Sequence, residues 1–170
     1  MLAIYLIISA VLIGLDQWVK YLTVANIQLG ETKEFIPGVL SFTNIRNTGA
    51  AWSLLEGKMW FFYIITVIVV AVVLYILVKN INGSKWFTVG LSLVLAGAIG
   101  NFIDRLRLGY VVDMFQTEFI NFPIFNVADS VLVIGVACIF IYLILDEKAA
   151  KDGKNGTNYC KNKTRKRTDR

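Results

Sequence analysis

The segment Met59–Val78 is a run of twenty residues without a single charged side chain, and it restricts what this chain can fold into. A helix rises 1.5 Å per residue, so this length spans roughly 30 Å, the thickness of a bilayer core. Similar apolar segments cover about residues 2–22, 86–104 and 127–145. We therefore predict a membrane all-α fold, a bundle of four transmembrane helices within one domain of residues 1–146.

The composition excludes several kinds of active site. Of the 170 residues 56% are hydrophobic and 17% are charged, and none is a histidine. A Ser-His-Asp triad, a Cys-His pair and a His-ligated metal site are therefore excluded within this chain. Cys138 lies in an apolar segment and Cys160 in a charged one, so we expect neither a disulfide nor a metal site.

The basic residues between the apolar segments predict their orientation. Residues 79–85 carry two basic side chains and no acidic one, and residues 147–170 are rich in Lys and Arg. The other two connections mix both signs, so we expect them outside and both termini in the cytoplasm. We expect residues 147–170 to be a disordered tail, attracted by anionic lipid rather than by nucleic acid.

The first outer connection contains turn signals. Pro37-Gly38 separates two short β-prone runs, which predicts a small sheet or hairpin within about residues 23–55. Asn47-Thr48-Gly49 is a second turn signal, and the small residues after it would let a chain or a lipid approach the backbone. An amphipathic interfacial helix starting near Gly49 is the open alternative.

Two aspartates, Asp113 and Asp129, stand among apolar residues. Asn126 is a good helix N-cap, and Asp129 would then be the N3 residue, where an acid stabilises the helix dipole. A capping role alone would account for Asp129. Asp113 has no basic neighbour in the sequence, and an acid near a bilayer needs a partner or a proton. Pro123 lies between the two, so the chain can turn back and bring the carboxyls together.

Two close carboxyls suit one kind of chemistry. Repulsion and partial desolvation keep one of them protonated near neutral pH. The ionised carboxyl can take a proton from water while the protonated one donates to a carbonyl oxygen, which hydrolyses a peptide without a covalent intermediate. Because a helix N-terminus favours ionisation, we expect Asp129 to be the base and Asp113 the acid, with roles that can exchange.

Polar side chains share helix faces at the ends of two other segments. Asn101 and Arg105 are four residues apart and could form a polar rim that orients the carboxyls and a substrate backbone. The alternative is an ordinary helix end with a surface pair between Asp104 and Arg105. Asp16 and Lys20 are also four apart, and an ion pair at the membrane interface would account for them.

Five strings occur in one order along nearly the whole chain. They are Asp16-Gln17-Trp18-Val19-Lys20, Asn47-Thr48-Gly49-Ala50-Ala51-Trp52, Gly100-Asn101-Phe102-Ile103-Asp104-Arg105, Val111-Val112-Asp113 and Phe125-Asn126-Val127-Ala128-Asp129-Ser130. With this order and topology the chain resembles signal peptidase II, a family of bacterial membrane aspartyl peptidases.

The resemblance implies a fold, a reaction and a set of site residues. The fold is four transmembrane helices with a small extracytoplasmic β-sheet that cradles the substrate. The reaction removes the signal peptide of a diacylglyceryl-modified prolipoprotein on the N-terminal side of the lipid-modified cysteine. The catalytic pair is Asp113 and Asp129, and the residues lining the site are Asp16, Lys20, Asn47, Gly49, Asn101, Arg105 and Asn126. We expect no metal or other cofactor, no nucleic-acid partner, contact with membrane lipid and a monomeric enzyme.

Two other classes of function fit parts of the sequence. Polar residues in membrane segments also mark the ion paths of transporters and channels, but here they gather at one face of the membrane. A Ser/Lys peptidase would use Ser41 or Ser53 with Lys20 or Lys58.

Overall fold

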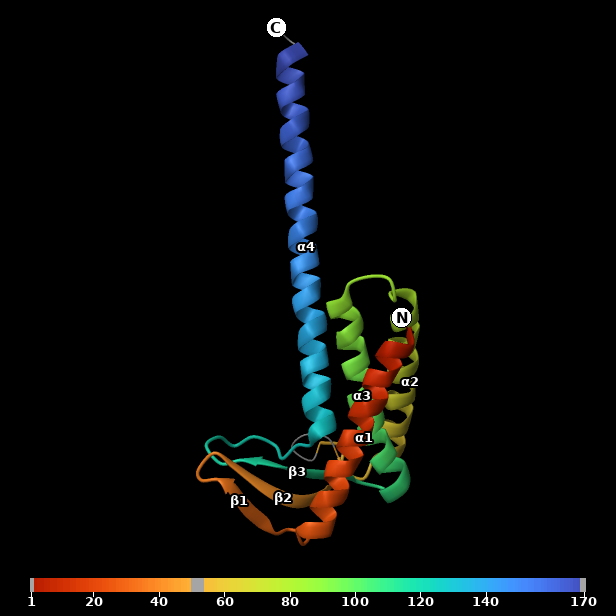
Figure 1. Ribbon diagram of the computed structural model, residues 1–170, viewed down its shortest axis with the longest axis vertical. Coiled ribbons are helices and arrows are strands. Elements are labelled where there is room, and N and C mark those ends of the chain that lie inside the picture. Colours follow the sequence, from red (N-terminus) through yellow and green to blue (C-terminus); the bar gives the residue numbers. More distant parts are fainter. Residues whose placement is uncertain (1, 50–53, 169–170) are drawn as a thin grey trace.

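The computed structural model describes residues 2–49 and 54–168, with side chains as far as Glu147. Within these residues a bundle of four helices stands on a three-stranded sheet (Figure 1). The helices are α1 (Leu2–Asn26), α2 (Met59–Lys79), α3 (Lys85–Leu108) and α4 (Val127–Thr168). Each contains a stretch long and apolar enough to cross a membrane, which confirms the predicted fold class.

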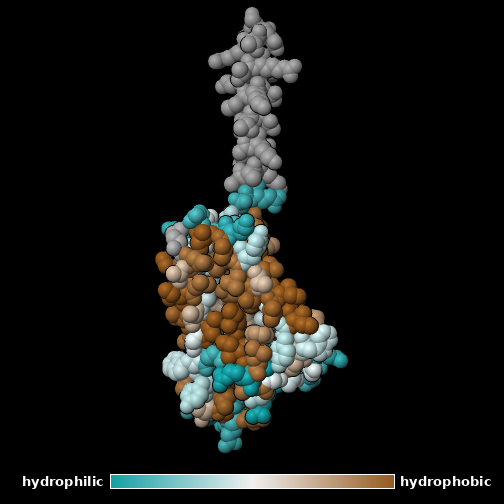
Figure 2. Space-filling model, turned by 90° about the vertical axis from the view of Figure 1, so that its right-hand side faces the viewer, coloured by the Kyte–Doolittle hydropathy of each residue, from teal (hydrophilic) through white to brown (hydrophobic). Residues whose placement is uncertain are grey.

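Helix α3 lies at the centre of the bundle. Over its apolar stretch 56% of the residues are buried, against 17% in each of the other helices. Gly97 lets α4 pack closely, because a Cβ at this position would come within 2.7 Å of the Cβ of Leu132. The remaining apolar side chains form a broad belt on the outside of the bundle (Figure 2). This is the pattern of helices surrounded by lipid.

The helices begin close to the predicted limits, and three of them end later than predicted. Helix α3 ends at Leu108, about one turn beyond the predicted end at residue 104. Helix α1 continues to Asn26, about one turn beyond the predicted end, because Thr23 and Asn26 bond back to the carbonyls of Val19 and Leu22. Helix α4 continues to Thr168, through the segment for which we expected disorder. Extending an existing helix needs no new nucleus, so a polar segment can follow a membrane helix in the same conformation.

The sheet joins strands from two distant parts of the chain. Strands β1 (Thr32–Ile36), β2 (Leu40–Asn47) and β3 (Val111–Thr117) are antiparallel in the order β1-β2-β3. Pro37-Gly38 makes the turn of the first hairpin, with Gly38 at φ 68° and Val39 N donating to the Ile36 carbonyl at 2.9 Å. Positive φ at the third position of a turn favours glycine, as the sequence predicted for this hairpin.

Strand β3 was not predicted, and it carries Asp113. Gly109, at φ 76°, ends α3 in the left-handed conformation, and the chain then turns into β3 beside β2. We had expected only a surface segment here, although Val111-Val112 and Phe115 are strand-forming residues.

The segment before α4 is fastened to β3. Met114 N and Phe115 N both donate to the Phe125 carbonyl, at 3.1 and 2.8 Å, and Phe125 N donates back to the Phe115 carbonyl at 3.1 Å. The ring of Phe125 lies 5.4 Å from the ring of Phe115, which lies 5.5 Å from the ring of Phe42. This pairing places the start of α4 beside β3, and so brings Asp129 close to Asp113.

Candidate active site

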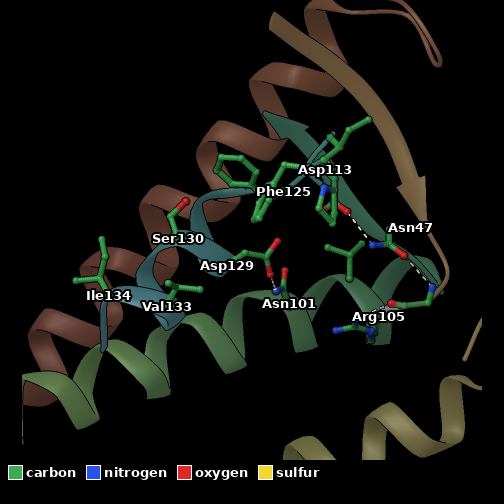
Figure 3. A pocket seen from close by; sticks show the side chains of 14 residues that line it. Asn47, Asn101, Arg105, Asp113, Phe125, Asp129, Ser130, Val133 and Ile134 are labelled. Carbon is green, nitrogen blue, oxygen red and sulfur yellow. Dashed lines mark hydrogen bonds between the residues drawn. The ribbon is translucent and has the colours of Figure 1, made fainter. Parts of the chain in front are cut away.

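A cavity of about 580 Å³ lies between the sheet and the adjoining ends of α3 and α4. Figure 3 shows Asn47, Arg105 and Asp113 toward one end of the cavity and Ser130, Val133 and Ile134 toward the other. The lining residues that are polar or glycine are Asn47, Gly49, Asn101, Arg105, Asp113, Asp129 and Ser130; the apolar ones are Val111, Phe122, Pro123, Ile124, Phe125, Val133 and Ile134.

Asp129 occupies the position that the sequence predicted for it at the start of α4. Its backbone N–H donates to Asn126 Oδ1 at 2.9 Å, and its Oδ2 accepts the backbone N–H of Asn126 at 3.1 Å. This reciprocal pair is a capping box, which fixes the side chain at the helix N-terminus. The other oxygen, Oδ1, accepts a hydrogen bond of 2.6 Å from Asn101 Nδ2. Both oxygens of the carboxyl are therefore oriented.

Asp113 is almost completely buried, with 2% of its surface exposed. Its two oxygens accept hydrogen bonds from Asn126 Nδ2 at 2.7 Å and from Asn47 Nδ2 at 2.9 Å. Burial raises the pKa of Asp113 to about 6, since desolvation, assisted by the nearby charge of Asp129, outweighs these two hydrogen bonds. A carboxyl with this pKa can hold or release a proton close to neutral pH.

Asn126 joins the two carboxyls. Its side-chain nitrogen binds Asp113, while its backbone N–H and its side-chain oxygen bind Asp129. The same nitrogen also donates to Asn101 Oδ1 at 3.0 Å. The two carboxyls are thus neighbours connected by one residue, and both face the same cavity (Figure 3).

Arg105 is held at the edge of the cavity by helix α2 and by the turn after β2. Its guanidinium lies 4.4 Å from the ring centre of Phe62, and its Nη2 donates to the Gly49 carbonyl at 3.1 Å. The hydroxyl of Tyr63 donates to the Arg105 carbonyl at 3.0 Å. Its buried Nε has no hydrogen-bond partner among the described residues. This arrangement keeps a positive, partly unsatisfied donor beside the two carboxyls.

The turn at Asn47 is also part of the site. Asn47 Oδ1 accepts the backbone N–H of Gly49 at 2.9 Å, while its Nδ2 binds Asp113. One side chain therefore shapes the turn and orients a carboxyl. The alternative of an interfacial helix starting near Gly49 concerns residues 50–53, which lie outside the described part of the chain.

Asp16 and Lys20 form the predicted ion pair, at 3.0 Å, but not at an exposed interface. They are 1% and 3% exposed and lie behind the wall of the cavity, where Asp104 joins them at 3.0 Å from Lys20. The surface pair considered for Asp104 and Arg105 is wrong, because Asp104 is 3% exposed and binds Lys20. Inward packing of α3 against α1 explains both differences.

Some site residues were not recognised from the sequence. Asp104 was identifiable in principle, since it lies three residues from Asn101 on the buried face of α3. Phe62 and Tyr63 lie in a uniformly apolar segment with no signal of a role. Val133 and Ile134 line the cavity, and nothing in the apolar segment 127–145 distinguishes them from their neighbours.

The alternative with a Ser/Lys pair does not fit the surroundings of Lys20. Its three ammonium protons face three acceptors, Asp16, Asp104 and Asn101 Oδ1, the last at 3.1 Å. All three protons are engaged, so none is left for a hydrogen bond to Ser41. Ser53 lies outside the described residues.

Among the described residues, no group of three or more Cys, Asp or Glu side chains could hold a metal ion, and Cys138 is a free thiol. A reaction without a metal stays a prediction.

Comparisons with known proteins agree with this geometry. A family described as signal peptidase (SPase) II matches residues 8–145. A lipoprotein signal peptidase of Enterococcus faecalis is 77% identical over 158 residues, covering 93% of this chain and 98% of that protein. One from Lactiplantibacillus plantarum is 53% identical over 148 residues, covering 87% and 99%.

Solved structures agree as well. A bacterial membrane enzyme has a TM-score of 0.82 and 42% identity, covering 85% of this chain and 90% of that one. A second has a TM-score of 0.77 and 43% identity, covering 83% and 92%.

Fold and comparisons together define a multi-pass membrane peptidase of the aspartic class. The chain belongs to the signal peptidase II family.

Proposed function

We propose that this peptidase removes the signal peptide of diacylglyceryl-modified prolipoproteins, with Asp113 and Asp129 as the catalytic pair. The observation that carries the proposal is that Asn126 joins a buried carboxyl, Asp113, to a half-buried one, Asp129, at a partly apolar cavity. The bond cleaved is the peptide bond on the N-terminal side of the lipid-modified cysteine.

The reaction needs a water molecule and the two carboxyls. Asp129 takes a proton from water while the water oxygen bonds to the scissile carbonyl carbon, and Asp113 donates a proton to the carbonyl oxygen. The tetrahedral intermediate then collapses: the C–N bond breaks as Asp129 gives its proton to the cysteine nitrogen, and Asp113 takes back the proton from the former carbonyl oxygen. The signal peptide leaves with a new carboxyl group. The pair returns to its starting state with one proton, so no metal or covalent intermediate is required.

Two observations support this division of roles. The pKa of Asp113, raised to about 6 by burial, suits a group that holds a proton. Asp129 is the N3 residue of α4, where the helix dipole favours the ionised form.

The polar and the apolar side chains of the cavity suit the two halves of the substrate. Phe122, Val133 and Ile134 offer apolar surface for the diacylglyceryl group. Arg105 and the turn at Asn47 offer donors and a carbonyl for the peptide backbone. Binding both halves fixes the scissile bond at the carboxyls, which raises their effective concentration. The roles assigned by resemblance to Gly49 and Asn101 fit their place in the cavity lining. Asn126 is fully buried outside that lining and would act by orienting the two carboxyls.

We place the cavity at the extracytoplasmic face of the cytoplasmic membrane and both termini in the cytoplasm. The support is the distribution of Lys and Arg in the connections. In Figure 1, α1 begins and α4 ends on the side of the bundle away from the sheet and the cavity. We expect the enzyme to act as a monomer, because both carboxyls come from one chain.

The test is cleavage of a diacylglyceryl-modified precursor peptide, followed by gel shift. Asp113→Asn and Asp129→Asn should each insert and fold but lose at least about 10³-fold in rate, since each removes a catalytic proton transfer. A precursor without the diacylglyceryl group should be a poor substrate for the unchanged enzyme. Near-normal turnover by either variant would refute the assignment of the pair.

A further inference from the structure

Three charged side chains, Asp16, Lys20 and Asp104, meet behind the cavity between α1 and α3. Lys20 Nζ lies 3.0 Å from Asp16 Oδ2 and 3.0 Å from Asp104 Oδ2. Gln17 Nε2 closes the group by donating to Asp104 Oδ1 at 2.8 Å and to Asp16 Oδ2 at 3.2 Å. Burying such a group is costly compared with apolar packing, so stability alone does not account for it.

The two carboxylates of this group also bind backbone next to the catalytic residues. Asp104 Oδ2 accepts the N–H of Val112 at 3.1 Å, one residue before Asp113. Asp16 Oδ1 accepts the N–H of Ala128 at 2.8 Å, one residue before Asp129. Since β3 and α4 are separate elements, the group fixes the backbone beside both catalytic carboxyls at once.

The ammonium of Lys20 makes a third connection through Asn101. Lys20 Nζ donates to Asn101 Oδ1 at 3.1 Å, and Asn126 Nδ2 donates to the same oxygen. These two donors orient the amide so that its nitrogen faces Asp129. Turned over, the amide would place its oxygen against the carboxylate of Asp129 and its NH₂ against Lys20, which is repulsive on both sides.

We propose that Asp16, Lys20 and Asp104 form a clamp that sets the relative position of the two catalytic carboxyls. The clamp rests on the function proposed above and adds positioning residues to it. Its fit is close: a Cβ on Gly100 would lie only 2.8 Å from Asp16 Oδ2. Displacing a reacting group by about 1 Å costs on the order of 10²-fold in rate, so the clamp acts on turnover more than on binding.

The clamp can be tested at Asp104, because Asp16 and Asp104 both bind the ammonium of Lys20 and one carboxylate is enough to pair with it. Removing one carboxylate leaves a matched pair of Lys20 and Asp16, so Asp104 variants are expected to fold. Asp104→Leu removes the acceptor for Val112 and should lower kcat about 10²-fold, with KM changed less than about threefold. Asp104→Asn keeps an oxygen for Val112 and Lys20 and loses only the acceptor for Gln17 Nε2, which still donates to Asp16 Oδ2 and to the Gly100 carbonyl. It should recover kcat to within about tenfold of the unchanged enzyme.

Ser9→Ala is the matched control. Ser9 Oγ donates to the Ser92 carbonyl at 2.9 Å, a buried bond between the same two helices but away from the cavity. We expect a lower Tm and an unchanged kcat. If Asp104→Leu does not fold, Gln17→Met replaces it. That variant removes donors to both carboxylates without touching β3 or α4, and should lower kcat several-fold at constant KM.

Four results would overturn the clamp. The first two are full kcat in folded Asp104→Leu and equal losses of kcat in Asp104→Leu and Asp104→Asn. The other two are an unchanged kcat in Gln17→Met, and a loss of kcat in Ser9→Ala as large as in the Asp104 variants when the Tm values are the same. Asp113→Asn and Asp129→Asn are assayed alongside. If these remain active, the proposed function fails. If they are inactive while Asp104→Leu has full kcat, the clamp alone fails.

Discussion

Two pairs of aspartates lie at the same end of this molecule, and they are built differently. Asp16 and Asp104 have the ammonium of Lys20 between them. Asp113 and Asp129 have the neutral amide of Asn126 between them and face a cavity. A cation lies between the side chains of the first pair and holds both in place. An amide orients the second pair without neutralising it, so this pair can share a proton and do chemistry.

The largest effect should come from removing the cation. Lys20→Met would leave two buried carboxylates without a counter-ion, and breaking a buried ion pair in this way typically costs about 3–5 kcal/mol. We expect much less folded protein in detergent, measured by the Tm and by the yield of monodisperse enzyme. A Tm close to that of the unchanged enzyme would mean that the two pairs of aspartates do not differ in the way described.

The next effect should come from removing the amide between the catalytic pair. Asn126→Leu is similar in size but loses the bonds to Asp113 and Asn101 and the side-chain cap of α4. We expect kcat to fall by about 10²-fold, since the carboxyls would no longer be held together. The loss of the cap should cost only about 1 kcal/mol in stability. Single-turnover kinetics at saturating precursor measure the cleavage rate of Asn126→Leu. A rate within a factor of about two of that of the unchanged enzyme would contradict the prediction.

A smaller and more specific effect should follow the loss of one hydrogen bond to Asp113. With a pKa of about 6, Asp113 loses its proton as the pH rises, so kcat/KM should fall on the alkaline side. Asn47 Nδ2 favours the ionised form, so Asn47→Leu should raise the pKa of Asp113. The alkaline limb of kcat/KM should therefore move to higher pH.

Asn44→Leu is the control for that shift. Asn44 is a buried asparagine of the same strand, and its Nδ2 donates to the Ile27 carbonyl at 2.8 Å rather than to a catalytic group. We expect it to lower the Tm and leave the alkaline limb in place. A limb that stays in place in Asn47→Leu, or moves equally in both variants, would show that the bond to Asp113 does not tune its proton.

The sequence predicted local features well and long-range contacts poorly. The four membrane helices, the Pro37-Gly38 hairpin and the cap of α4 by Asn126 and Asp129 each depend on residues close in sequence. Strand β3 was missed because its pairing with β2 joins residues about sixty-five positions apart, as in Asn47 with Val111.

The same limit applies to the burial of charge. An i,i+4 spacing predicted the pair of Asp16 and Lys20, but the pair's depth depends on Asp104, which comes from another helix. Likewise, nothing in an apolar segment marks Phe62 as the ring beneath Arg105. The resemblance to a family identified the residues at the cavity; only the fold shows which line it and which lie behind it.

We infer that Asp113 and Asp129 activate water directly, without a covalent intermediate. The most direct measurement is a single turnover in H₂¹⁸O with enzyme in excess over precursor, followed by mass spectrometry of the released signal peptide and of the enzyme. We predict one ¹⁸O in the new carboxyl group of the peptide and none in Asp113 or Asp129. Unlabelled peptide together with ¹⁸O in either aspartate would show a covalent intermediate and contradict the account.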